Sequence, residues 1–289
     1  TLWDTSNPYL YDMKVSLTKD GKVVDDVKSY TAFRKISSKR DANGIMRMQL
    51  NNKNLFQYCP LDQGWWRDGL YTAPTDEALL YDIVKTKDWG FNMIRKHVKV
   101  EPARWYYHCD KEGILVWQDM PSGDMGNQWA PHTYNGGTDK ERSSASIANY
   151  YQEWKEIMDL CVSHPSVVVW VPFNEAWGQF DTEKVAEWTK NYDPSRLVNP
   201  ASGGNHRACG DILDLHNYPG PSMFLFDPQR VTVLGEYGGI GLPLENHLWW
   251  NKRNWGYVQF KNSDEVTAEY VKYANELKEM VDRGFSAAV

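Results

Sequence analysis

Two glutamates follow apolar runs that are typical of buried strands. Glu175 comes directly after VVVWVPFN, and Glu236 comes directly after VTVLG. A carboxylate in such a position adds nothing to apolar packing and needs polar partners. Two carboxyl groups across one cavity are the minimum apparatus for cleaving a glycosidic bond, because one protonates the departing oxygen while the other attacks the sugar or activates water.

The protonation of these glutamates depends on their separation. If they lie about 5 Å apart, their repulsion is roughly 3 kcal/mol at an effective dielectric of about 20. That repulsion predicts that one of the two stays protonated near neutral pH. Gly235, Gly238 and Gly239 flank Glu236 and predict the close approach of a ligand. Taken singly, either glutamate could equally cap a helix or pair with an arginine.

Further polar residues stand where predicted strands end, and in a barrel of parallel strands these ends form the active site. The candidates for sugar binding are Asp62, Arg95, His97, Asp119, Asn174, His216, Asn217 and Tyr218. Trp249 and Trp250, in the long segment after the seventh predicted strand, are candidates for stacking against a sugar. The alternatives are a salt bridge for Asp119, a structural role for His97 and His216, and loop anchoring for the tryptophans.

Motifs of several other chemistries are absent from the sequence. It contains no HxH or HExxH, no GxSxG elbow and no P-loop. The cysteines, at positions 59, 109, 161 and 209, are too scattered for a zinc site or a disulfide framework. The sequence therefore predicts neither a metal nor a cofactor.

The elements that must position these residues alternate between strand and helix. Eight apolar runs are predicted strands, at 55–61, 91–97, 114–120, 167–173, 197–201, 211–218, 231–237 and 285–289. Helical patterns lie between them at 75–90, 101–113, 141–164, 181–192 and 263–284, with weaker connections at 202–210 and 220–230. This pattern predicts an α/β fold, a (β/α)8 TIM barrel. A doubly wound sheet is the alternative, but no GxGxxG turn follows the first strand.

The N-terminal segment has a different pattern. YLYDMKVSLT alternates, KDGK is typical of a hairpin turn, and the extended pattern continues to about residue 37. The polar stretch 37–44 is predicted to be a linker, followed by a second hairpin, IMRMQL–NN–KNLFQY. A lone hairpin is marginal in water, so the first 37 residues are predicted to pack on the barrel or to be part of a larger β-sandwich.

Composition limits the classes of partner that this chain could bind. Hydrophobic residues make up 42% of the 289, and no run approaches the roughly 18–20 apolar residues that span a bilayer. The formal net charge of −6 argues against nucleic acid. The predicted partner is an oligosaccharide or another glycoside, and a homo-oligomer is compatible with the sequence. A periplasmic or secreted location is slightly favoured over the cytoplasm.

Several segments together carry a family resemblance. LWDTSNPYLY, SYTAFRKI, LDQGWWRDGLYT, HPSVVVWVPFNEAWGQ and VTVLGEYGG, in this order, resemble glycoside hydrolase family 2, which includes β-galactosidases, β-glucuronidases and β-mannosidases. The resemblance implies that Glu175 is the acid/base and Glu236 the nucleophile. It also implies that Asn174 binds the sugar 2-hydroxyl and that Arg95 and Tyr218 orient the nucleophile.

The same resemblance divides the chain. Residues 1–37 would be the C-terminal remnant of an immunoglobulin-like β-sandwich, and 38–289 the catalytic barrel, truncated at its end. The sequence thus predicts a retaining exo-β-glycosidase, β-galactosidase-like, that releases terminal β-linked sugars by double displacement. The alternatives are a carbohydrate-binding barrel without catalysis and a structural domain whose glutamates are ion-paired.

Overall fold

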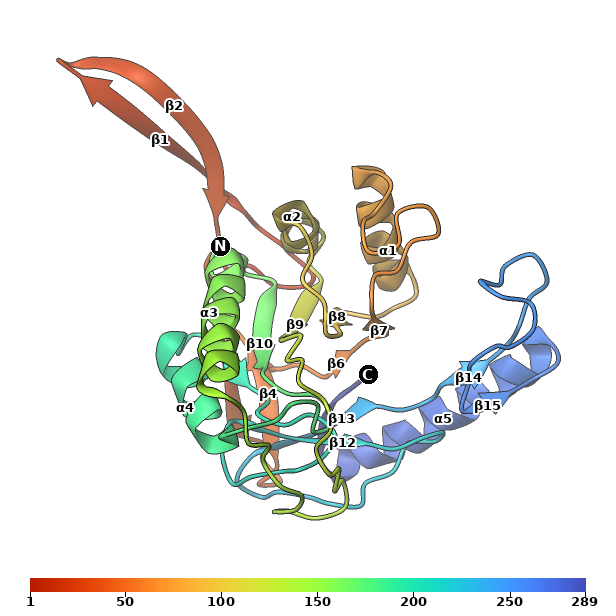
Figure 1. The fold of residues 1–289 in the computed structure, drawn as a ribbon. Coiled ribbons are helices and arrows are strands. Elements are labelled where there is room, and N and C mark those ends of the chain that lie inside the picture. Colours follow the sequence, from red (N-terminus) through yellow and green to blue (C-terminus); the bar gives the residue numbers. More distant parts are fainter.

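Parallel strands surround a common axis in the computed structural model, which describes residues 1–289 (Figure 1). One sheet has the order β11-β10-β9-β8-β7 and the other β12-β13-β16-β6. Their bounds are β6 Gln57–Tyr58, β7 Leu61–Asp62, β8 Met93–Lys96, β9 Leu115–Asp119, β10 Val167–Val171, β11 Leu197–Val198, β12 Ile212–His216, β13 Val231–Glu236 and β16 Phe285–Ala288.

The two sheets join at both edges. β6 and β7 are consecutive halves of one interrupted strand, which gives eight strands around the axis. At the other edge, Asp211 N donates to Val198 O at 2.8 Å and Gly203 N donates to Asp214 O at 3.0 Å. The predicted (β/α)8 barrel is therefore confirmed.

The five strongest helical patterns all form helices. These are α1 Asp76–Asp88, α2 Ala103–Glu112, α3 Ser144–Cys161, α4 Thr182–Tyr192 and α5 Ser263–Arg283. Thr75, Ser143 and Asn262 cap α1, α3 and α5, each accepting a backbone N–H in the first turn. The connections at 202–210 and 220–230 contain no helix. None of the helices is both long and apolar enough to cross a membrane.

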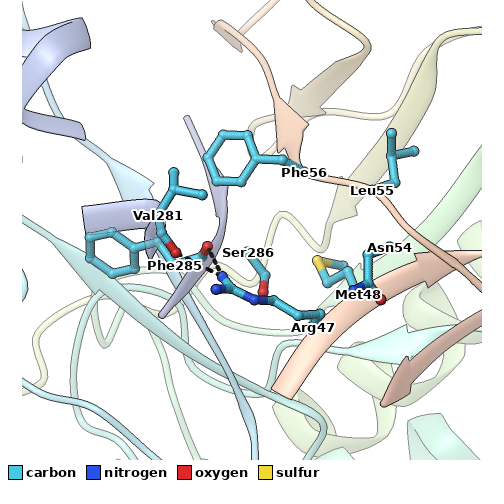
Figure 2. Close-up of a pocket in the computed structure, with 8 residues that line it drawn as sticks. All are labelled: Arg47, Met48, Asn54, Leu55, Phe56, Val281, Phe285 and Ser286. Carbon is cyan, nitrogen blue, oxygen red and sulfur yellow. Dashed lines mark hydrogen bonds between the residues drawn. The ribbon is translucent and has the colours of Figure 1, made fainter. Parts of the chain in front are cut away.

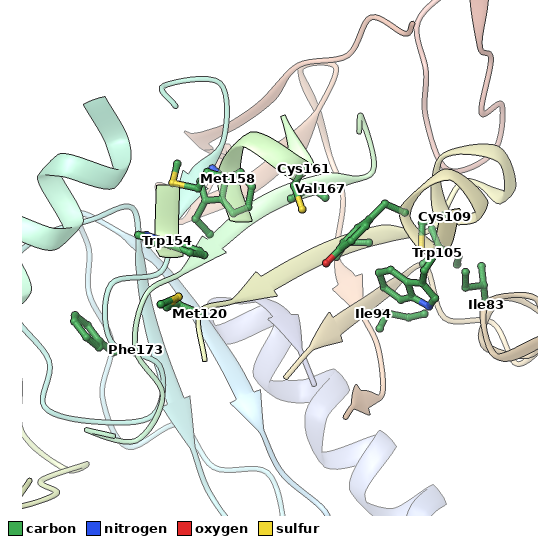
Figure 3. Packing of buried hydrophobic residues seen from close by; sticks show 14 of the residues in the cluster. Ile83, Ile94, Trp105, Cys109, Met120, Trp154, Met158, Cys161, Val167 and Phe173 are labelled. Carbon is green, nitrogen blue, oxygen red and sulfur yellow. The ribbon is translucent and has the colours of Figure 1, made fainter. Parts of the chain in front are cut away.

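Core residues form an outer layer and an inner one because strand side chains alternate. Ile94 faces the helices and packs in a cluster with Trp105 (Figure 3). Met93 belongs to the inner cluster. The outer cluster combines strand residues with Trp154 and other residues of the helices. The same alternation sends Arg95 toward the barrel axis, where a buried guanidinium requires polar partners.

The N-terminal segment contains a projecting hairpin and a small sheet. β1 (Tyr11–Lys19) and β2 (Lys22–Thr31) pair antiparallel and extend away from the barrel (Figure 1). Their turn residues, Asp20 and Gly21, have φ of 50° and 76°, as the Asp-Gly signal predicts. At its base, Tyr30 Oη donates to Asp110 Oδ2 at 2.6 Å and Arg34 Nη2 to Val167 O at 2.8 Å.

The predicted linker at 37–44 is wrong. β3 (Ile36–Arg40) pairs with β4 (Met46–Leu50), which pairs in turn with β5 (Lys53–Asn54). Ile36 is buried opposite Leu50, so the polar residues that follow it occupy a sheet edge and not a flexible connection. The predicted second hairpin is confirmed as β4 and β5. Residue 37, the predicted boundary between the N-terminal segment and the barrel, lies inside β3.

The small sheet contacts the start of β16. Arg47 of β4 donates to Val281 O at 2.9 Å and to Phe285 O at 2.7 Å, beside a pocket of about 160 Å³ (Figure 2). Phe285 and Phe56 border this pocket where β16 and β6 begin. The pocket is therefore at the N-terminal end of the strands. Two short strands, β14 (Ile240–Gly241) and β15 (Val258–Gln259), pair within the long connection from β13 to α5.

Candidate active site

The two glutamates face each other at the C-terminal end of the barrel. Glu236 is the last residue of β13, and Glu175 follows β10. One oxygen of each carboxylate and one ring nitrogen of His216 all lie within 4.8 Å of one another. Glu175 and Ala176 have φ of 45° and 62°, an uncommon backbone region that occurs at functional turns. The Glu175 N–H donates to Ser202 O at 2.8 Å, which fixes this turn to the segment that follows β11.

Arg95 is completely buried and uses all its donors. Nε and Nη2 donate to the two oxygens of Asp119 at 3.1 and 2.9 Å, and Nη2 also donates to Asn174 Oδ1 at 2.9 Å. Nη1 donates to Gly235 O at 3.2 Å and to Glu236 Oε1 at 3.3 Å. Because a guanidinium has five N–H groups, none is left over. Asp119 is thus part of a buried salt bridge, one of its two predicted roles.

Tyr218 holds the other oxygen of Glu236. Its hydroxyl donates to Oε2 at 2.6 Å, and its ring stacks on Tyr257 with a centroid separation of 3.9 Å. Burial and the negative charge of Glu236 raise the pKa of Tyr218, so the phenol stays a donor. Glu236 is therefore oriented by a cation on one oxygen and a hydroxyl on the other.

His216 lies between the two glutamates. Its Nδ1 is 2.9 Å from Glu175 Oε1 and 3.6 Å from Glu236 Oε2. Burial alone would raise the pKa of Glu175, but the hydrogen bond from His216 and its positive charge hold that pKa below its usual value. The pKa of Glu175 therefore does not rise as repulsion between the two carboxylates alone would predict, because His216 lies between them. Burial opposes a charge on His216, yet Glu236 and Glu175 raise its pKa.

Asn174 and His97 each leave a buried donor free. Asn174 Nδ2 has no hydrogen-bond partner, although its Oδ1 accepts from Arg95. His97 Nδ1 is 2.9 Å from Gln63 Nε2, which can only donate, so the His97 proton is on Nε2. That Nε2 has no partner and lies 3.6 Å from Glu236 Oε1. Burial and the nearby Arg95 lower the pKa of His97, which favours the neutral ring.

Other predicted site residues lie elsewhere. Asp62 binds Lys96 Nζ at 2.6 Å on the helix side of the barrel, because Lys96 alternates with the inward-facing Arg95. Asn217 donates to Gly220 O at 2.6 Å and fixes its own loop. Trp249 and Trp250 are 68% and 57% exposed in the segment before β15. The structure does not bring these four side chains into contact with the two glutamates.

The glycines around Glu236 make room for protein side chains. A Cβ on Gly235 would lie 2.0 Å from Asp214 Oδ1, and one on Gly239 would lie 2.4 Å from the Tyr257 ring. The expectation that these two glycines admit a ligand is therefore wrong. Gly238 has no neighbour within 4 Å of such a Cβ.

Sequence reasoning missed a second row of residues behind the glutamates. Ser202 Oγ is 2.8 Å from His216 Nε2 and donates to Asp214 Oδ2 at 2.6 Å. Asn199 Nδ2 also donates to Asp214, at 2.6 Å. Asp214 precedes His216 by two residues on β12, so strand alternation could have placed both on the axis side. Nothing in the sequence signals Ser202.

Solvent reaches the two carboxylates from the open end of the barrel. The Glu175 side chain is 20% exposed, and Glu236 lines a hollow of about 240 Å³ together with Tyr218, Tyr58, Tyr237 and Tyr270. Glu175, His216 and Glu236 are residue types that bind metals, but their atoms are already engaged with one another, Arg95 and Tyr218. This arrangement suits proton transfer and nucleophilic attack.

Comparison with known proteins gives the family. Residues 72–218 match the family described as glycosyl hydrolases family 2, TIM barrel domain, and residues 1–34 match glycosyl hydrolases family 2. This chain belongs to glycosyl hydrolase family 2. The sequence-based family resemblance is therefore confirmed.

Relatives within family 2 carry two enzyme names. A β-galactosidase of Halalkalibacterium halodurans is 28% identical over 251 residues, which are 82% of this chain and 24% of the relative. A putative β-glucuronidase of Formosa agariphila is 29% identical over 204 residues, 70% of this chain and 18% of the relative. The chain thus spans about a fifth of the length of curated relatives that it matches.

The family 2 fold extends to solved structures. Bacteroides uniformis β-glucuronidase 2, covalently bound to cyclophellitol-6-carboxylate aziridine, superposes over 100% of this chain and 36% of its own, with a TM-score of 0.76 and 19% identity. At that identity the match establishes the fold alone.

Proposed function

We propose that this chain is the catalytic part of a retaining exo-β-glycosidase, β-galactosidase-like, which hydrolyses terminal β-linked sugars. The observation that carries the proposal is the separation of Glu175 and Glu236, whose facing oxygens lie within 4.8 Å of each other. Retaining glycosidases hold their carboxyl groups about 5 Å apart, whereas inverting enzymes leave a wider gap for water.

Glu236 is the proposed nucleophile. Its carboxylate attacks the anomeric carbon while the bond to the departing oxygen breaks, and Glu175 gives that oxygen a proton. Glu175 then removes a proton from water, the water oxygen attacks the anomeric carbon, and the ester bond to Glu236 breaks. Arg95 and Tyr218 support this assignment because they bind the two oxygens of Glu236 and fix its orientation.

Asn174 and His97 are the proposed sugar-binding groups. Each has a buried donor without a protein partner, and an unpaired buried donor costs about 1–3 kcal/mol unless a ligand takes it. Sugar hydroxyls would accept from both donors.

Residues 1–37 are proposed to be the end of a β-sandwich, because β1 and β2 expose Val15, Leu17 and Val27 on a hairpin that has no covering layer.

The test combines two substitutions with a stereochemical measurement on the full-length protein. Glu175→Gln should reduce turnover of an aryl β-glycoside with a poor leaving group by about 10²–10⁴-fold, and Glu236→Gln by at least as much. Proton NMR of the first-formed sugar should show the β anomer. An α product, or near wild-type turnover in either variant, would reject the mechanism.

A substrate screen tests the glycone. Nitrophenyl β-galactoside, β-glucuronide, β-mannoside and β-glucoside are compared by kcat/KM, and we expect the galactoside to be preferred. Preference for the glucuronide would transfer the assignment to the activity named for the Formosa agariphila relative. Saturable sugar binding without hydrolysis would support the carbohydrate-binding alternative.

A further inference from the structure

His216 is the one imidazole in contact with Glu175, and its hydrogen bonds constrain its protons. The ring is buried, with Glu175 Oε1 2.9 Å from Nδ1 and Ser202 Oγ 2.8 Å from Nε2. Ser202 has a single hydroxyl proton, and it donates that proton to Asp214 Oδ2 at 2.6 Å. Because that proton is directed to Asp214, Ser202 accepts from His216, so Nε2 carries a proton.

The other nitrogen then has two alternatives. A proton must lie between Nδ1 and Glu175 Oε1, since two acceptors do not approach to 2.9 Å without one. Either His216 is a cation beside an ionised Glu175, or His216 is neutral beside a protonated Glu175. Both forms use the same hydrogen bond and differ only in the position of one proton.

We propose that His216 and Glu175 share this exchangeable proton, and that His216 is the positioning residue that stores it for the acid/base. The inference rests on the proposed function of Glu175. When the leaving group departs, its oxygen takes the shared proton through Glu175, which leaves both Glu175 and Nδ1 of His216 unprotonated. When Glu175 later deprotonates water, that proton restores the pair, so the cycle balances.

The charges around His216 favour storage on the ring. Glu236 Oε2 is 3.6 Å from Nδ1 and Asp214 Oδ1 is 3.9 Å from Nε2, both attracting a cation. Arg95 Nη1, 3.4 Å from Nε2, opposes it, and His97 is held neutral. The facing titratable and charged groups are therefore Arg95, His97, Glu175, Asp214 and Glu236. The positive shift in the pKa of His216 agrees with their balance.

Storage of the proton on His216 predicts how kcat/KM depends on pH. Because the proton belongs to a coupled pair, the basic limb of the kcat/KM profile reports the pair and not Glu175 alone. Without the imidazole, Glu175 must hold the proton itself and releases it at lower pH. His216→Gln preserves a donor toward Glu175 but cannot carry the charge, so its basic limb should move to lower pH.

Two substrates with different leaving groups distinguish a loss of proton supply from structural damage. In His216→Gln at pH 7, kcat/KM for a 4-methylphenyl β-glycoside should fall by about 10²-fold, because this leaving group needs a proton. The 2,4-dinitrophenyl glycoside leaves without one, and should lose no more than about threefold. Lowering the pH should restore the 4-methylphenyl rate. His132→Gln, in an exposed loop, is the matched control and should behave as wild type.

Two results would overturn the proposal. One is an equal loss for both leaving groups with an unchanged pH profile, which is the signature of a structural role. The other is independent of activity: ¹⁵N-histidine NMR of the intact protein should show both His216 nitrogens protonated at pH 7, and Glu175→Gln should lower the pH at which one is lost. A neutral His216 in the wild type would reject proton storage, whereas failure to hydrolyse any glycoside would reject the proposed function instead.

Discussion

Arg95 and Glu236 form an ion pair near the axis of the barrel, with 3.3 Å between Nη1 and Oε1. The same guanidinium binds both oxygens of Asp119 and the amide oxygen of Asn174. Arg95 therefore connects β8, β9, β13 and the turn after β10. Its removal would disturb the proposed nucleophile and the proposed sugar ligand together.

Arg95→Met should destabilise the fold as well as abolish turnover. Taking away the guanidinium leaves Asp119 and Glu236 buried without a counter-charge, which costs about 3–5 kcal/mol of unfolding free energy. Denaturant titration measures the loss. Arg104→Met, which removes an exposed pair with Asp76, should change stability by less than about 1 kcal/mol. Equal stability of the two variants would refute the structural role of Arg95.

Tyr218→Phe should weaken catalysis while keeping the fold. The substitution removes one hydrogen bond to a carboxylate oxygen, worth about 1.5–3 kcal/mol, or about 10–150-fold in kcat. We expect KM to change less, because the phenol contacts Glu236. Tyr192→Phe on α4, whose hydroxyl donates to Asp159 on the exposed surface, serves as the control. A kcat unaffected by Tyr218→Phe would show that the hydroxyl does not orient the nucleophile.

Gly235→Ala should displace Asp214. The added methyl carbon would lie 2.0 Å from the carboxylate, and the buried strand leaves little room to move. We expect a loss of about 1–3 kcal/mol in unfolding free energy, measured by thermal or chemical denaturation. Gly220→Ala, whose methyl would come no closer than 3.2 Å to Tyr273, should cost clearly less. If both variants unfold alike, Asp214 has more freedom than its contacts indicate.

Stability should fall with acidification because of His206. Burial lowers the pKa of His206 to about 4, from 6.5 in the unfolded chain. Between these values the unfolded chain binds a proton that the folded protein refuses, so folding weakens as the pH falls. At pH 5 the loss attributable to His206 is about 2 kcal/mol relative to pH 7. His206→Gln should flatten the curve of unfolding free energy against pH over this range, and parallel curves would contradict the prediction.

Much of the fold could be predicted from apolar runs. The runs before Glu175 and Glu236 are long enough to identify the strands, and Arg95 follows from alternation on β8. The same argument could not predict which way Asp62 points. The first strand is interrupted between β6 and β7, so its inward and outward positions do not alternate regularly up to Asp62. β3 was missed because only Ile36 is buried in an otherwise polar strand.

The site was predictable only in part, because a sequence gives the ends of strands but not the contacts between them. His216 was found as a candidate, yet its place between two carboxylates reverses the direction of the Glu175 pKa shift. Ser202 lies in a glycine-rich turn without any pattern, so only the structure connects it to His216. Trp249 and Trp250 lie in a segment without hydrophobic periodicity, so the sequence does not indicate which way their side chains point.

The pairing of β16 with both β6 and β13 links distant parts of the chain. During synthesis on a ribosome, the strand that carries Glu236 has a bare edge until residues 285–288 emerge. An unpaired edge of this kind is a template for intermolecular pairing. The nascent chain is thus open to intermolecular pairing along β13 until β16 is available to cover that edge.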